Sequence, residues 1–346
     1  MRRILPIFIV MGIMAALCAP SGAGPLMWGF ALDGYPVTQA KLKTVESATA
    51  LRSDMIVFFL QWPSPQDLSS GEFPLESLEA ISATGALPCI TWEPMHIKDG
   101  KEITIPFRTL LDGGYDPYLI RFAQEAKSWN KPLLIRFAHE MNLKRYHWGT
   151  KEEEYGPESP AIYRKMYRYV VDLFRRCGAE NVLWVFCPNS EAVPNAACDP
   201  SASWNTLSSY YPGDGYADIL GVDGYNWGTT RKKETHGWES RWQSFGEIFE
   251  RPCVELKTLG SSGARKPLIV FETSTVGAGG DKMQWIRNAV ATSRRLGIDG
   301  IVWFQSDKEL DWRIESGSDR SYLSTVEQER VPRQDWTKRF TNQKER

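Results

Sequence analysis

The sequence has 346 residues, with 41 lysines and arginines against 42 aspartates and glutamates, so its formal net charge is −1 at pH 7. This balance excludes the strongly basic footprint of a nucleic-acid-binding protein. Hydrophobic residues make up 42% and charged residues 24%, which indicates a globular protein. The 14 tryptophans and 13 tyrosines favour carbohydrate binding, because aromatic rings stack on sugars, although tryptophan is also a large core residue.

The N-terminus has the pattern of a secretory signal peptide over residues 1–23. Two arginines precede the apolar stretch 4–19, which contains a proline and is short for a membrane span. The small residues 21–23 fit a cleavage site. We therefore expect a mature chain that begins near Gly24, is secreted or periplasmic, and has no stable membrane insertion after cleavage.

Two alternatives to a cleaved, soluble product stay open. The apolar stretch could remain uncleaved as an anchor. Cys18 raises the question of lipid attachment, which Leu17 disfavours because a small residue normally precedes a lipidated cysteine.

Beyond this segment, apolar runs and amphipathic segments alternate along the chain. The apolar runs predict strands at residues 25–32, 55–61, 86–92, from 133, 182–186, 219–223, 268–271 and 301–304. Helices are predicted at 75–83, 115–130, 160–176, 238–259 and 283–296, and residues 94–114 are expected to form a long loop.

Eight short strands separated mainly by helices predict an α/β fold, a single (β/α)8 TIM barrel. We expect the barrel to cover residues 24–330, with a polar C-terminal tail at 331–346. A doubly wound open sheet is the alternative, but no Gly-x-Gly-x-x-Gly motif follows a strand.

Five cysteines remain after the expected cleavage, and an odd number leaves at least one thiol free. Cys89 lies inside an apolar run and is expected to be buried. Cys187 and Cys198 flank one loop and could pair. The spacing of the cysteines and histidines does not suggest zinc, and we assign no metal and no cofactor.

Two of the predicted strands end at a glutamate. The segment 131–149, KPLLIRFAHEMNLKRYHWG, runs into Glu140, and the segment 266–275, KPLIVFETST, runs into Glu272. The C-terminal ends of barrel strands form the active site of this fold. A glycosidase needs one carboxyl to protonate the leaving oxygen and one carboxylate to attack or to activate water. Each glutamate alone could instead be a surface ion-pair partner.

The motifs around these glutamates resemble glycoside hydrolase family 26, which is typified by β-mannanases. The resemblance extends from about residue 28 to residue 312. Its motifs are Arg136-x-x-His139-Glu140-x-Asn142 with Trp148-Gly149, the segment 184–189, the segment 211–225 and Phe271-Glu272. The segment 143–147 departs from the family pattern because it is more basic than the usual aromatic run.

This resemblance implies a retaining glycosidase in which Glu140 is the acid/base and Glu272 the nucleophile, with carboxyl groups about 5–5.5 Å apart. It implies an exported endo-β-glycanase that cuts a β-linked polysaccharide, first of all an endo-β-1,4-mannanase. Mixed-linkage β-glucan and β-1,3-xylan are alternative substrates within the same family. We expect a monomer.

Several polar residues at the predicted strand ends are candidates for substrate contact. An unpaired Arg136 inside the barrel would be costly, so we expect it to point inward and fix Glu272 electrostatically. His139 could bind the sugar or the nucleophile, or be structural. Tyr225 is expected to hydrogen-bond the nucleophile. Asn142 and Asn189 could contact sugar hydroxyls or cap loops.

Aromatic residues supply candidates for stacking on sugar rings. Trp303 is expected to form the platform under the sugar at the cleavage point, with barrel core as the alternative. Trp92 and Glu93 end the third strand and could line a subsite. Trp148 and Trp227 are weaker candidates for stacking.

A protein of another class remains an alternative, namely a non-catalytic polysaccharide-binding protein in exopolysaccharide handling. The richness in aromatic residues and the altered 143–147 segment favour it, whereas the presence of both glutamates disfavours it. A zinc peptidase is disfavoured because His139-Glu140 is not followed by a histidine at the His-Glu-x-x-His spacing.

Overall fold

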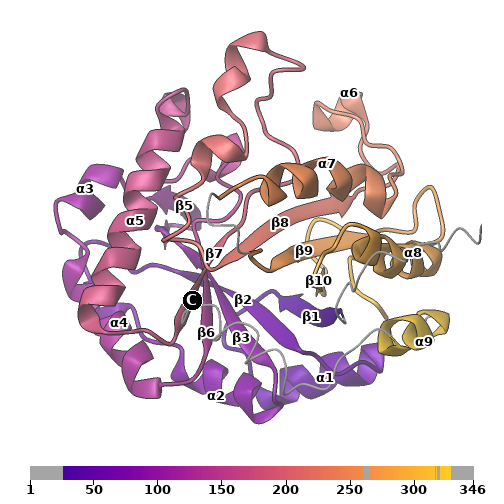
Figure 1. Cartoon of the computed structure of the whole chain (residues 1–346), viewed down its shortest axis with the longest axis horizontal. Coiled ribbons are helices and arrows are strands. Elements are labelled where there is room, and N and C mark those ends of the chain that lie inside the picture. Colours follow the sequence, from indigo (N-terminus) through magenta and orange to yellow (C-terminus); the bar gives the residue numbers. More distant parts are fainter. Residues whose placement is uncertain (1–25, 261–264, 316, 318–319, 329–346) are drawn as a thin grey trace, which may run out of the picture.

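The fold is a closed barrel of strands surrounded by a ring of helices (Figure 1). The computed structural model describes residues 26–260, 265–315, 317 and 320–328. The predicted signal peptide at 1–23 and the predicted tail at 331–346 lie outside these residues. Within the described chain, all eight predicted barrel strands are confirmed.

The barrel strands are parallel and close in the order β1-β2-β3-β6-β7-β8-β9-β10. Their bounds are β1 (Met27–Leu32), β2 (Met55–Gln61), β3 (Leu87–Glu93), β6 (Leu133–Phe137), β7 (Val182–Phe186), β8 (Ile219–Asn226), β9 (Leu268–Thr275) and β10 (Gly300–Phe304). The helices are α1 (Gln39–Thr49), α2 (Leu75–Ala83), α3 (Phe107–Leu111), α4 (Asp116–Trp129), α5 (Ser159–Cys177), α6 (Lys233–His236), α7 (Phe245–Lys257), α8 (Lys282–Arg295) and α9 (Ser321–Gln328).

Several segments differ from the sequence prediction, among them α1, α6 and α9, for which no helix was predicted. The helix expected at 238–259 begins only at Phe245, because Ser244 and Glu247 form a capping box in which each side chain accepts from the other's backbone N–H. The loop expected at 94–114 contains α3 and an antiparallel hairpin of β4 (Met95–Lys98) and β5 (Lys101–Thr104).

The core has two layers, because successive side chains of a strand point to opposite faces. In β1, Met27 and Ala31 fill the barrel interior, whereas Trp28 and Phe30 pack outward against the helices. The same alternation assigns Trp92 of β3 and Trp303 of β10 to the outer layer. Polar residues that continue the inward-facing set reach the C-terminal mouth of the barrel.

The cysteines of the described residues are all free. Cys89 is buried, as predicted. The pairing of Cys187 with Cys198 is wrong, because Cys187 is buried inside the barrel and Cys198 is exposed on the loop that follows β7.

Candidate active site

Glu140 follows β6 through a turn with an uncommon backbone conformation. Ala138 and Glu140 have φ angles of 49° and 50°, in the left-handed region that disfavours side chains. The backbone N–H of Glu140 donates to the carbonyl of Cys187 at 2.8 Å, which ties the turn to β7. This turn aims the Glu140 carboxyl at the barrel mouth, where the residue is only 7% exposed.

Glu272 lies inside β9 and belongs to a buried ionic network centred on Arg136 of β6. The Arg136 guanidinium, fully buried, pairs with Glu272 and with Asp223, the latter at 2.5 Å between Nη1 and Oδ2. Its Nε and Nη2 also donate to the Thr91 hydroxyl at 3.0 and 2.6 Å. The inward contact expected between Arg136 and Glu272 is therefore present, and it compensates a charge that would otherwise be costly to bury.

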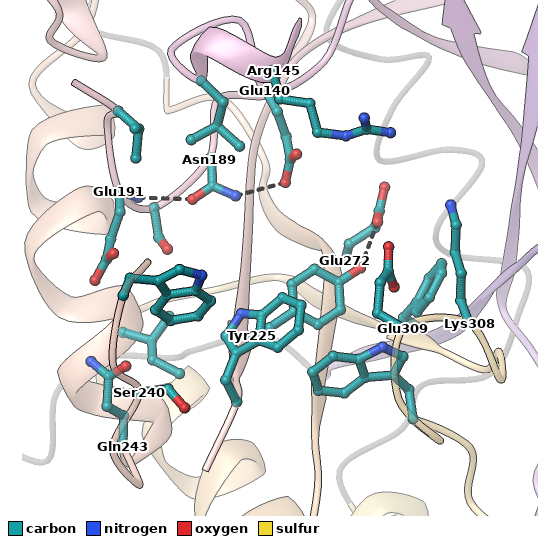
Figure 2. Close-up of a pocket in the computed structure, with 18 of the residues that line it drawn as sticks. Glu140, Arg145, Asn189, Glu191, Tyr225, Ser240, Gln243, Glu272, Lys308 and Glu309 are labelled. Carbon is teal, nitrogen blue, oxygen red and sulfur yellow. Dashed lines mark hydrogen bonds between the residues drawn. The ribbon is translucent and has the colours of Figure 1, made fainter. Parts of the chain in front are cut away.

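Tyr225, at the end of β8, donates its hydroxyl to Oε2 of Glu272 at 2.6 Å (Figure 2). Glu272 thus accepts from a guanidinium on one oxygen and from a phenol on the other. Two such donors suit a charged carboxylate, because hydrogen bonds to the charged form stabilise it.

Glu140 has a different environment. Burial and, next, the negative charge of Glu272 raise the pKa of Glu140 to about 7. Asn189 opposes this shift, since its Nδ2 donates to Oε1 of Glu140 at 2.7 Å. The two carboxyls therefore differ in their partners: Glu140 has a neutral amide and a raised pKa, whereas Glu272 has a cation. Such a pair fits one proton donor and one nucleophile.

Both carboxyls face a cavity of about 870 Å³ at the mouth of the barrel (Figure 2). Its wall mixes aromatic rings with charged and amide groups, as is typical of sugar-binding clefts. The lining residues are Phe59, Glu140, Leu143, Arg145, Tyr146, Asn189, Ser190, Glu191, Val193, Tyr225, Trp227, Trp238, Glu239, Ser240, Arg241, Gln243, Ile248, Glu272, Phe304, Lys308, Glu309 and Trp312.

Comparison with known proteins agrees with this geometry. The model described as glycosyl hydrolase family 26 matches residues 118–238. Endoglucanase H of Acetivibrio thermocellus is 32% identical over 326 residues, which cover 91% of this chain and 32% of that protein. A mannan endo-1,4-beta-mannosidase of Bacillus subtilis is 27% identical over 132 residues, which cover 37% of this chain and 30% of that protein. Residues 118–238 thus match glycosyl hydrolase family 26, and the similarity to Endoglucanase H extends over 91% of the chain.

Solved structures of mannanases share the fold. A mannanase of Bacillus subtilis superposes with a TM-score of 0.60 at 17% identity, covering 87% of this chain and 84% of that one. A family 26 β-mannanase of Bacteroides ovatus gives a TM-score of 0.56 at 16% identity, with 89% of each chain covered. The chain spans about a third of the length of the two sequence relatives described above, 32% and 30%.

The structure brings part of the predicted substrate-contact set to the cavity. Asn189, Tyr225 and Trp227 line it. Asn142 does not: it is fully buried behind Asn189, where Oδ1 accepts from the Asn189 N–H at 2.8 Å and Nδ2 donates to the Asn189 carbonyl at 2.9 Å. Asn142 therefore positions the backbone of Asn189, the residue that contacts Glu140.

His139 and Trp148 lie just behind the cavity wall. The His139 ring packs between Phe59 and Tyr146, and burial, with Arg136 next, lowers its pKa well below the usual range. The indole N–H of Trp148 donates to the His139 carbonyl at 2.7 Å, and its ring stacks on Tyr146. The expected stacking of Trp148 on a sugar is therefore wrong. Tyr146, and not Trp148, lines the cavity at this point.

The expected roles of Trp92 and Trp303 in sugar contact are wrong. Both are fully buried on the outer side of the barrel, where Trp92 packs on Trp62 and Phe122, and Trp303 packs on Trp28 and Trp285. The cause is the alternation of side chains along β3 and β10, which turns these two positions away from the barrel mouth.

Glu93 does face inward at the end of β3, but it is not among the cavity-lining residues. Its carboxyl accepts from Gln61 at 2.5 Å, and burial raises its pKa to about 7. Glu93 is therefore buried beside the site, in contact with Gln61, and does not form an open subsite wall.

Sequence reasoning missed several lining residues. Phe59 is two residues after an inward-facing position of β2, so the alternation of side chains along that strand could have identified it. Trp238 falls in a segment predicted as helix, and Trp312 follows the last predicted strand. No motif marks these two. Among the described residues there is no group of three or more metal-binding side chains, and no described helix has the length and hydropathy to cross a membrane.

Proposed function

We propose that this chain is a retaining endo-β-glycanase, with Glu140 as acid/base and Glu272 as nucleophile. The observation that carries the proposal is the unequal environment of the two carboxyls, one with a pKa raised to about 7 and the other paired with a buried arginine. An acid with a pKa near neutrality can be protonated in the resting enzyme and still accept a proton later.

In the first step Glu140 donates its proton to the glycosidic oxygen while a carboxylate oxygen of Glu272 attacks the anomeric carbon. The bond to the leaving sugar breaks and a glycosyl ester of Glu272 forms. Glu140, now ionised, takes a proton from water, which attacks the same carbon and releases Glu272. Two inversions give a product of retained configuration. Tyr225 and Arg136 orient Glu272 through the two contacts described above.

We propose β-1,4-mannan as the first substrate, supported by the mannan endo-1,4-beta-mannosidases among the relatives. A specific observation favours β-glucan as a second candidate: the relative that matches 91% of the chain is named Endoglucanase H. We also propose, from the N-terminal pattern, that the protein is secreted or periplasmic.

The test is release of reducing ends from mannan, glucomannan, mixed-linkage β-glucan and β-1,3-xylan, with NMR detection of the first anomer formed. We expect release from mannan and glucomannan with the β-anomer appearing first. Release from mixed-linkage β-glucan alone would replace mannan by glucan as the substrate. Binding in affinity electrophoresis without turnover on any of the four would favour the non-catalytic alternative.

A further inference from the structure

The cavity continues beyond the two glutamates along the segment 227–244, which joins β8 to α7 and is called here the 227–244 loop. Trp238 of this loop lines the cavity and is 44% exposed. Its ring meets Trp227 edge to face, with centroids 5.6 Å apart, and the Arg231 guanidinium lies 4.5 Å from the Trp227 ring. An indole held by other aromatic and cationic groups but left open on the cavity side is a surface prepared for a ligand.

The 227–244 loop is fixed to the barrel at both ends by one buried side chain. The Asn226 carbonyl oxygen Oδ1 accepts from the N–H groups of Gly228 and Gln243, at 3.2 and 2.9 Å. Its Nδ2 donates to the Thr275 hydroxyl at 2.8 Å. Because Asn226 is fully buried, it ties the start and end of the loop to neighbouring strands.

Further contacts hold the returning part of the loop. Trp242 packs so closely on Gly280 that a Cβ there would lie 2.4 Å from its ring. The indole N–H of Trp285, on α8, donates to the Gln243 carbonyl at 2.8 Å. Ser240 is bridged to Arg231 by two hydrogen bonds, at 3.0 and 3.2 Å. Trp238 is therefore presented by a loop that is already ordered, which reduces the entropy lost when a ligand binds.

The groups around Trp238 suit a sugar. Ser240, Gln243 and Glu191 line the same part of the cavity and offer a hydroxyl, an amide and a carboxylate. A pyranose presents an apolar face to an aromatic ring and hydroxyls at its rim, so this combination of ring and short polar groups matches it.

The position of these groups relative to the catalytic pair sets the direction of the chain. In Figure 2, Ser240, Gln243 and Glu191 lie on the Asn189 side of Glu140, whereas Lys308 and Glu309 lie on the side of Glu272. Glu140 protonates the leaving oxygen, so the leaving sugars extend on its side of the cleft. We propose that Trp238 is the platform of a distal subsite that binds a pyranose of the leaving-group chain. This inference rests on the proposed function.

The test compares substrates that do and do not reach Trp238. Replacement Trp238→Ala is expected to lower kcat/KM on the polysaccharide and on its hexasaccharide by about tenfold, the effect of one modest contact. Hydrolysis of an aryl β-glycoside is expected to stay unchanged, because its leaving group does not extend to the 227–244 loop. Trp238→Phe, which keeps an aromatic face, should retain most of the activity on the hexasaccharide.

Trp129→Ala is the matched control, because Trp129 lies on α4 outside the cavity and its loss should leave all rates as they are. An unchanged hexasaccharide rate in Trp238→Ala would overturn the inference, as would an equal loss on the aryl glycoside. If the wild-type protein hydrolyses no glycan, the proposed function fails. In that case, calorimetry compares binding of the hexasaccharide to the wild-type protein and to Trp238→Ala. Weaker binding by Trp238→Ala supports the subsite, and equal binding overturns it.

Discussion

At the residue scale, Asn189 and the carboxylate of Glu272 act in opposite directions on the proton of Glu140. The negative charge of Glu272 and burial raise the pKa of Glu140 to about 7, and the amide of Asn189 lowers it through a hydrogen bond to the ionised oxygen. The proposed acid must be protonated before it can act. Its activity is therefore present below this pKa and lost as the pH rises through it.

We expect kcat/KM on an oligosaccharide to fall above a pH of about 7, the pKa of Glu140. Asn189→Ala removes the donor that favours the charged form, so the alkaline limb of the pH profile should move to higher pH. Asn288→Ala, an exposed amide on α8, is the control and should leave the limb in place. A limb that moves to lower pH in Asn189→Ala would contradict the assignment of Glu140 as the acid.

Replacement of each glutamate is expected to block a different step of the reaction. Glu272→Gln removes the nucleophile, so no glycosyl ester forms with any leaving group. Glu140→Gln removes the proton donor, which matters little for an aryl glycoside with a good leaving group. Loss of the base still slows the second step, so the ester should accumulate and give a burst of phenol.

Azide separates these two cases, because it attacks without a general base. In Glu140→Gln azide should accelerate turnover of the aryl glycoside by attacking the glycosyl ester, and it should yield the β-glycosyl azide, which NMR identifies. Rescue of Glu272→Gln with formation of the β-azide, or rescue of Glu140→Gln with formation of the α-azide, would mean that the two roles are reversed.

At the element scale, the barrel depends on close approach between neighbouring strands. Gly29 of β1 pairs with Met55 of β2, and a Cβ on Gly29 would lie 2.6 Å from the Met55 carbonyl oxygen. That oxygen belongs to the backbone of a barrel strand and cannot rotate away as a flexible side chain can. A methyl group at this position must therefore push the two strands apart.

Gly29→Ala is expected to lower the free energy of unfolding by about 1–3 kcal/mol, the usual cost of overpacking a well-packed interior. Urea unfolding followed by tryptophan fluorescence measures it. Gly215→Ala is the matched control, since a Cβ at Gly215 meets nothing within 4 Å. Equal stability of the two variants would show that β1 and β2 have room at Gly29.

At the scale of the whole molecule, the described part of the chain is held together by packing and hydrogen bonds, with its cysteines as free thiols. Cys89, Cys187 and Cys253 are buried, and burial raises the pKa of the Cys89 thiol to about 12. Cys198 is exposed on the loop after β7. The reactivity of each thiol should therefore follow its exposure to solvent.

We expect the thermal midpoint of the chain from residue 24 onward to be the same with and without dithiothreitol. In the native protein, a thiol-specific reagent should modify Cys198 first, and the three buried thiols should react only after unfolding. Cys198→Ser should remove the fast phase. A thermal midpoint that drops in the presence of dithiothreitol would point to a disulfide and contradict the free thiols.

The sequence by itself determined the eight barrel strands, five of the helices around them and the two glutamates. Apolar runs gave the eight strands, because a strand buried on both faces is apolar throughout. Glu140 and Glu272 stood out because each follows such a run. The alternation of side chains along a strand would also have assigned Trp92 and Trp303 to the outer layer. Cys89, Thr91 and Glu93 share the inward face of β3, so Trp92 points outward. Val302 and Phe304 share the inward face of β10, so Trp303 points outward.

The walls of the cavity were decided only by the tertiary structure. Trp238 reaches the cavity because the 227–244 loop is held by Asn226 of β8, which also donates to Thr275 of β9, and by Trp285 of α8. Likewise Tyr146, and not Trp148, faces the site because Trp148 is tied to the His139 carbonyl. Strands and helices follow from short-range periodicity, but a loop takes its conformation from contacts with residues far away in the sequence, which periodicity does not encode.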